Sequence, residues 1–238
     1  MPPAGAGAPF PEAAAAWTDA ARACRSASTY AATIHVHGHA GPDRLNATMI
    51  GLVTGADEIS LTVPVIFGAP AFVLGGTATT ATLWLPHDHR VVVARADEIV
   101  EALTGLRLTP RALLAIFTGC VGQSQTMVES ARYDRLGAIT SDDARVFVER
   151  DAGGWHITRG VTAGLIVEYR DIQAEWPRSL RVTTPPDRTP AVDLTMTLEQ
   201  IEVNVTHPPR DFVVSYARDA VPMTLEDLRA AGPLREKK

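Results

Sequence analysis

Apolar and polar residues alternate along much of this chain, which is the pattern of β-strands with one buried face. Residues 30–36 carry Tyr, Ala, Ile and Val at every second position, and residues 45–53 repeat the pattern. The turn residues Gly41, Pro42 and Asp43 stand between the two segments. The two segments therefore predict a β-hairpin with one apolar face.

Similar runs bounded by turn residues predict more strands downstream. The Asp-Ala-Gly-Gly sequence at 151–154 is a strong hairpin signal between two of them. The expected strands cover residues 59–63, 71–74, 79–85, 90–94, 144–150, 155–159, 161–169, 179–183 and 192–205.

Four segments predict helices from capping residues or from apolar positions three and four residues apart. The clearest begins at Thr109 and Pro110, a cap followed by a proline at the first helical position, and ends at Phe117 before Gly119. The others cover residues 12–26, residues 98–103 with Asp97 as cap and Gly105 after the end, and a short tail helix after Thr224.

These elements predict an α+β fold, because helices on one side of a long antiparallel sheet give that layer arrangement. About ten or eleven strands in sequence order must curl, so we expect a strongly curved sheet, an incomplete β-barrel covered by lid helices. The Pro/Gly/Ala-rich residues 1–11 are expected to be a flexible tether, and residues 12–238 a single domain.

The connection between the strands at 59–63 and 71–74 is unusual because its tip is apolar. Val65, Ile66 and Phe67 lie between Pro64 and Gly68, where a connection normally presents polar residues to water. An exposed apolar tip marks contact with a membrane, a lipid or a partner. The alternative is a loop that folds back onto the core.

Composition narrows the classes of partner. The chain has 238 residues, 46% hydrophobic and 21% charged, with a formal charge of −5, which excludes a basic face for nucleic acid. Every apolar run is interrupted before the length of about 18 residues that a membrane helix needs. The first residues lack the basic and apolar regions of a signal peptide. A chain that begins downstream of a leader would have such a sequence.

Candidate chemistry is sparse. No nucleophile elbow, zinc-protease motif, phosphate loop or dinucleotide fingerprint occurs in a fitting context, so we do not expect an enzyme or a cofactor. His35, His37 and His39 alternate on the polar face of one strand, where solvation explains them better than a metal. Cys24 and Cys120 lack metal-binding spacing, and composition leaves open two buried thiols or one disulfide.

In this order of features the chain resembles the periplasmic lipoprotein-carrier superfamily, the LolA/LolB-like proteins, and most of all the LolB-like outer-membrane acceptors. The resemblance covers most of residues 17–214 but contains no diagnostic motif. It is carried by the segments at 17–53, 65–74, 81–86, 99–110 and 117–120.

The resemblance implies a half-barrel whose apolar interior holds the acyl chains of lipids or lipoproteins. Its expected lining is Ile34, Val36, Leu45, Met49, Leu61, Val63 and Leu83, roofed by Leu113 and Phe117 of the lid helix. It also implies that Val65, Ile66 and Phe67 contact the inner leaflet of the outer membrane.

A periplasmic location follows from the same resemblance, with an N-terminal lipid anchor that this sequence lacks and a possible periplasmic carrier protein as partner. In that compartment Cys24 and Cys120 should form a disulfide. The expected function is therefore a lipid or lipoprotein carrier or acceptor. An envelope sensor or structural binding module on the same fold is the alternative.

Overall fold

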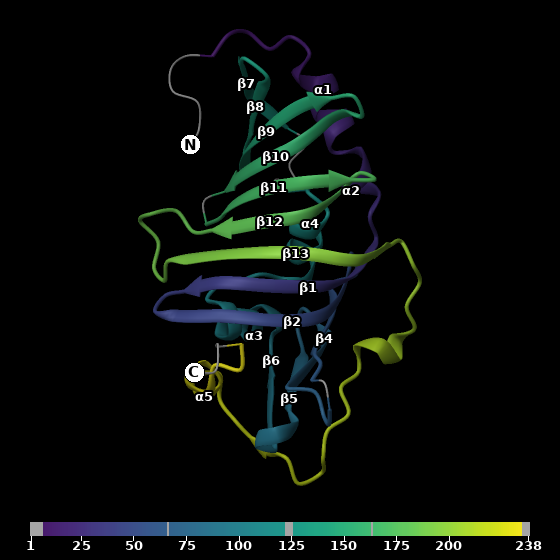
Figure 1. The fold of residues 1–238 in the computed structure, drawn as a ribbon, viewed down its shortest axis with the longest axis vertical. Helices are drawn as coiled ribbons and strands as arrows, with labels where there is room; N and C mark the ends of the chain where they lie inside the picture. Colours follow the sequence, from purple (N-terminus) through teal and green to yellow (C-terminus); the bar gives the residue numbers. More distant parts are fainter. Residues whose placement is uncertain (1–6, 66, 122–125, 163, 235–238) are drawn as a thin grey trace. The chain divides into compact units, whose positions relative to one another are not determined.

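The computed structural model describes residues 7–65, 67–121, 126–162 and 164–234 (Figure 1). The chain divides into two compact units. The first unit is Met1–Ser26 with Ala115–Arg188, and the second is Ala27–Leu114 with Thr189–Lys238. The expectation of a single domain over residues 12–238 stays a prediction.

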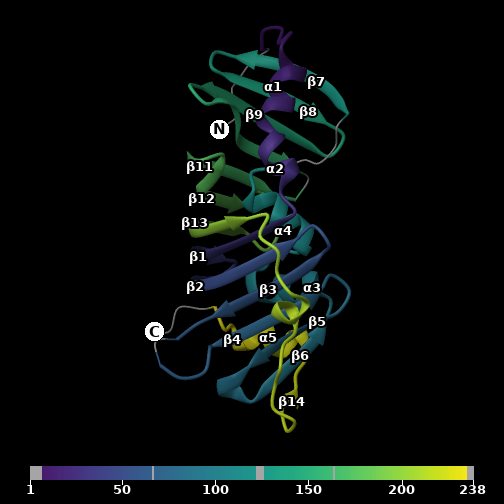
Figure 2. The same cartoon turned by 90° about the vertical axis from the view of Figure 1, so that its right-hand side faces the viewer.

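The first unit is an antiparallel sheet with two short helices. Its strand order is β12-β11-β10-β9-β8-β7. Helix α1 lies across β8 and β9 (Figure 2) and also packs on β10. The elements are α1 Ala13–Ala20, α2 Arg22–Ser26, β7 Met127–Tyr133, β8 Leu136–Ser141, β9 Ala144–Asp151, β10 Gly154–Thr162, β11 Ile166–Gln173 and β12 Trp176–Thr183.

The N-terminal segment is packed on the first unit from Ala8 onward. Ala8 exchanges two backbone hydrogen bonds with Arg132 on β7, and Phe10 is buried beside Trp155. Phe10 fills the space over Gly137, where a Cβ atom would lie 2.2 Å from its ring. The described end of the expected tether is therefore part of the folded unit.

The second unit holds the larger sheet, with strand order β14-β6-β5-β4-β3-β2-β1-β13. All its neighbouring strands are antiparallel except β14, which runs parallel to β6. The elements are β1 Thr29–Ala40, β2 Asp43–Thr54, β3 Glu58–Val63, β4 Phe72–Thr77, β5 Ala81–Leu85, η1 Pro86–Asp88, β6 Arg90–Ala94, α3 Ala96–Thr104, β13 Val192–Val203, η2 Pro209–Phe212, β14 Val221–Pro222 and α5 Leu225–Ala231.

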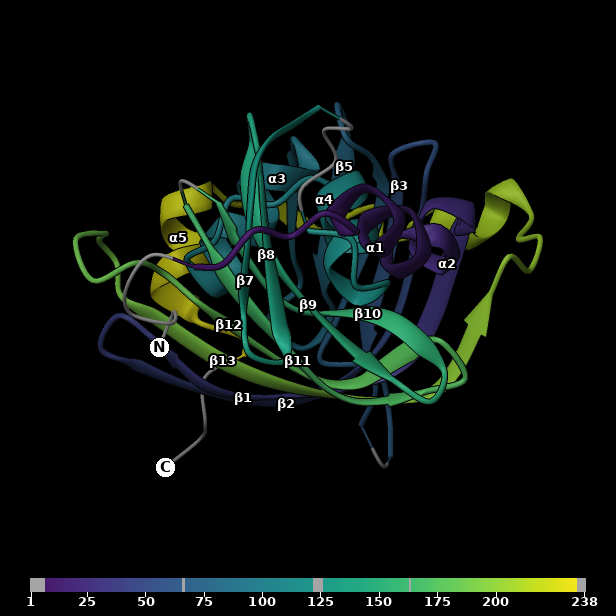
Figure 3. The ribbon, with the colours of Figure 1, turned by 90° about the horizontal axis from the view of Figure 1, so that it is seen from above.

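Helices cover the concave side of the second unit's sheet. Strands β1 and β2 bow, and α3 and α5 lie on the side toward which they curve (Figure 3). Helix α4, Pro110–Phe117, begins in the second unit, where the backbone N–H of Arg111 donates to Asp57 at 3.2 Å. The predicted α+β class, with a curved, unclosed antiparallel sheet and helices, is confirmed.

The chain after β13 crosses the second unit as a strap before it forms α5 (Figure 1). Phe212 is buried at η2, and its carbonyl oxygen lies 2.8 Å from where a Cβ atom of Gly75 would be. Helix α5 then packs against α3 and buries Leu228. Thr224 caps α5, as predicted, through reciprocal hydrogen bonds with Asp227.

Several local predictions need correction. Residues 12–26 form two helices rather than one. The strand expected at 161–169 is divided between β10, which ends at Thr162, and β11, which begins at Ile166. The β7–β8 hairpin was not expected at all. Its turn carries Asp134 at a φ of 54° where a glycine would have been a signal.

Candidate functional site

The apolar face of the second unit brings together most of the side chains expected to line a cavity. Ile34 pairs with Met49, while Leu61 pairs with Leu74, which in turn pairs with Leu83. The side chains of Ile34 and Leu61 approach each other over Gly51. A Cβ atom at position 51 would lie 2.7 Å from Ile34 Cδ1 and 3.1 Å from Leu61 Cδ2, so a larger residue would crowd them. Ile34, Val36, Leu45, Met49, Leu61, Leu83 and Leu113 are all buried in this unit, and Phe117 is buried in the first unit.

One row of this face remains partly open. Val36 on β1 pairs with Ala47 on β2 and with Met196 on β13, so the three side chains lie on the same face. Val36 is buried, but Ala47 and Met196 are only half-buried, as is Val63 at the end of β3. A completed core would leave no such row accessible.

A pocket of about 310 Å³ opens in the second unit beside Leu45. Its walls are the β1–β2 turn, the end of α3, the end of α5 and Pro190. Of the expected lining residues, Leu45 is the one that this pocket shares. Sequence reasoning missed the rest because α5 and the β1–β2 turn are far apart in the chain and carry no common motif.

The β3–β4 connection presents apolar side chains to solvent. Phe67 is 91% exposed and Val65 is 39% exposed. The base of the connection is closed by a hydrogen bond from the Ala71 N–H to the Val63 carbonyl, and His87 Nε2 donates to the Ala69 carbonyl at 3.1 Å. Ile66, the third residue of the predicted tip, lies outside the described residues. The alternative of a loop folded back onto the core is wrong for Val65 and Phe67.

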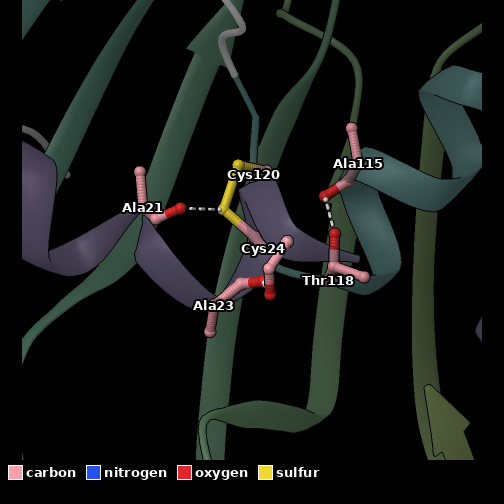
Figure 4. Close-up of a disulfide and its surroundings, with 7 residues drawn as sticks. Ala21, Ala23, Cys24, Ala115, Thr118 and Cys120 are labelled. Carbon is pink, nitrogen blue, oxygen red and sulfur yellow. Dashed lines mark hydrogen bonds between the residues drawn. A yellow bond between two sulfur atoms is a disulfide. The ribbon is translucent and has the colours of Figure 1, made fainter. Parts of the chain in front are cut away.

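Cys24 and Cys120 form a disulfide within the first unit, as predicted (Figure 4). The bond joins α2 to the segment just after α4, with the two Cα atoms 5.5 Å apart. Both cysteines are buried. The bridge closes a loop over a sequence separation of 96 residues.

Among the described residues, no three His, Cys, Asp or Glu side chains are placed to hold a metal ion, and no helix is long and apolar enough to cross a bilayer. His37 and His39 are exposed, and His35 lies 3.4 Å from Glu199 and 2.9 Å from Thr48. The lining of a pocket of about 320 Å³ in the first unit includes the charged residues Asp19, Arg22, Asp151 and Glu175.

Asp97 has a structural role in α3 that differs from the one predicted. The helix begins at Ala96 after Arg95, so Asp97 is inside its first turn rather than at its cap. Burial alone would raise the pKa of Asp97, but hydrogen bonds and charge from Arg107 at 2.9 Å and Arg95 at 3.0 Å lower it below the ordinary value.

Comparison with known proteins identifies the fold. No known family profile and no curated protein sequence match the chain. Among solved structures, a LolA superfamily protein from Nitrosomonas europaea has a TM-score of 0.50 at 8% identity, over 84% of this chain and 97% of that one. A DUF1329 family protein from Desulfovibrio piger has a TM-score of 0.49 at 9% identity, over 84% and 96%. The likeness to the Nitrosomonas europaea protein shows that the chain has a LolA-like fold, as the resemblance implied.

Proposed function

We propose that this protein is a periplasmic carrier or acceptor that holds acyl chains of lipids or lipoproteins and helps to deliver them to the outer membrane. The observation that carries the proposal is the β3–β4 connection, where Phe67 is 91% exposed on a LolA-like fold. Exposing a phenylalanine to water costs about 1.5–3 kcal/mol relative to burial, so such a tip needs an apolar partner.

The apolar face of the second unit is the proposed place for cargo. Val36, Ala47 and Met196 form a row that is partly accessible, among buried neighbours such as Ile34 and Leu61. Each buried methylene contributes about 0.8 kcal/mol, so a long acyl chain needs no polar recognition to be held. The expected lining, Ile34, Val36, Leu45, Met49, Leu61, Val63, Leu83, Leu113 and Phe117, remains a proposal.

The β3–β4 tip is proposed to dock on the inner leaflet of the outer membrane. Release of an acyl chain requires a competing apolar phase, and Val65 and Phe67 would hold the protein at one. The Cys24–Cys120 disulfide fits an oxidising compartment. A lipid anchor before residue 1 and a periplasmic carrier as partner belong to the same proposal.

Vesicle flotation of a Val65→Glu and Phe67→Glu double variant tests the membrane contact. Binding would require the double variant to bring two carboxylates into the membrane in place of two apolar side chains. We therefore expect at least a tenfold loss of binding to phospholipid vesicles with no change in thermal stability. Val128→Glu is the matched control, because Val128 is 64% exposed on β7 in the first unit. We expect this variant to bind vesicles as well as the wild type. A double variant that binds vesicles as well as the wild type contradicts the proposal.

A further inference from the structure

We infer that the pocket between the β1–β2 turn, α3 and α5 is the entrance through which an acyl chain reaches the apolar face of the second unit. This inference rests on the proposed function and adds a location that the expected lining did not contain. It gives the C-terminal helix α5, whose role the sequence left unassigned, a place in ligand binding.

The pocket has the size and lining of a ligand site. Its volume of about 310 Å³ falls at the lower end of the usual range of about 300–1,000 Å³. Leu45 and Leu103 contribute buried apolar side chains, and Ala102 contributes a small, half-buried one. A space this small holds one end of an acyl chain, and the remainder must extend beyond it.

Three charged residues belong to the lining of the pocket, and we assign them to its rim. Asp43 on β2, Glu101 on α3 and Arg229 on α5 all line it. Charged groups stay hydrated, so the polar end of a lipid is stable at this rim while an apolar chain enters below it. An entrance needs this division between a wet rim and an apolar floor.

Leu45 in the pocket lies next to the partly open row on the same face of the sheet. Leu45 and Ala47 point to the same face of β2, about 7 Å apart along the strand. Ala47 is the half-buried partner of Val36, which also pairs with Met196. The side chains that follow one another across this face, Leu45, Ala47, Val36 and Met196, are all apolar, and we infer that the acyl chain lies along them.

The walls are held at fixed distances by packing and capping. Gly105 ends α3 at a φ of 76°, and a Cβ atom there would lie 3.2 Å from Pro190 and 3.7 Å from Ala40. Helix α5 buries Leu228 and ends at Gly232, and the Asn46 N–H donates to the Leu234 carbonyl at 3.2 Å. The pocket therefore lies between elements that are each anchored to the second unit.

Filling the pocket with Ala102→Trp tests the inference. Binding of dansylaminoundecanoic acid is measured by fluorescence, with thermal unfolding as a check on folding. We expect a dissociation constant at least tenfold higher than that of the wild type, because the indole occupies the entrance. Ala14→Trp is the matched control, because Ala14 is exposed on α1 in the first unit. We expect this variant to bind the probe with wild-type affinity.

Unchanged affinity of Ala102→Trp, with a wild type that binds the probe, would overturn the inference and leave the proposed function in place. A wild type that does not bind the probe would overturn the proposed function itself.

Photocrosslinking of the wild type with a diazirine-labelled palmitic acid gives a second test that needs no variant to fold. We expect adducts on peptides containing residues 40–45, 101–105 or 229–232. Adducts confined to other peptides would contradict the entrance.

Discussion

The two units use the same device, a sheet with one apolar face under helices, but fill that face differently. In the first unit the interior side chains Val148, Val167 and Leu180 have no measurable exposure, and Gly137 and Gly160 are covered by the side chains of Phe10 and Val121. Val121 lies 2.6 Å from where a Cβ atom of Gly160 would be. In the second unit Ala47 and Met196 stay half-buried on the equivalent face.

This difference separates a structural core from a candidate binding surface. Native cores are packed to the density of organic crystals, and the full burial of Val148, Val167 and Leu180 in the first unit is consistent with such a core. Leaving an apolar row accessible to water does not stabilise the folded state, and a pocket of about 310 Å³ opens beside this row. Carriage is therefore proposed for the second unit, while the first unit supplies stability.

Loss of the disulfide should have the largest effect on stability. Bridging about 100 residues restricts the unfolded chain by up to about 4.7 kcal/mol in the chain-entropy model. We expect Cys24→Ser with Cys120→Ser to lower the free energy of unfolding by about 2–4 kcal/mol in urea denaturation, while the folded variant still binds an acyl probe. Loss of probe binding by the folded variant would break the division of roles between the units.

Truncation of one side chain in each unit should sharpen the comparison. Leu180→Ala, in the filled face of the first unit, should cost about 3 kcal/mol because it leaves a cavity. Met196→Ala, in the partly open row, should cost about 1 kcal/mol because the removed atoms are already partly exposed to water. Urea denaturation of the two variants would measure both free energies of unfolding. Equal losses would contradict the difference in packing.

The sequence predicted most accurately those features that depend on residues close together in the chain. Thr109 and Pro110 open α4 and Thr224 caps α5, because capping depends on residues within one turn. The exposure of Val65 and Phe67 was predicted because these residues lie in a connection between the turn residues Pro64 and Gly68. The disulfide followed once the resemblance supplied a compartment.

Long-range contacts explain what the sequence did not predict. Phe10 belongs to a proline-rich start, yet it packs over Gly137 about 127 positions later in the chain. Asp97 looked like a cap, but Arg107 and Arg95 hold it inside α3. The pocket beside Leu45 is formed by segments that meet only after folding.

The smallest effect is a pH dependence in α3. The folded state lowers the pKa of Asp97, so its contribution is complete above the ordinary carboxyl value of about 4 and is lost as the pH falls toward the folded-state pKa. Asp97→Asn should reduce the free energy of unfolding by about 1 kcal/mol at pH 7, since both arginine partners are half exposed. Urea denaturation at pH 3 should show a smaller difference, and a constant difference would refute the ion pair as its cause.

The most direct test of the account is a tryptophan introduced at the half-buried Ala47, compared with one at the buried Ala32 on the same face. An open row has room for the ring, so Ala47→Trp should change the free energy of unfolding by less than about 1 kcal/mol, whereas Ala32→Trp should cost about 1–3 kcal/mol or more. The account predicts that Ala47→Trp also lowers the affinity for dansylaminoundecanoic acid at least tenfold. A destabilised Ala47→Trp protein that still binds the probe with wild-type affinity would contradict it.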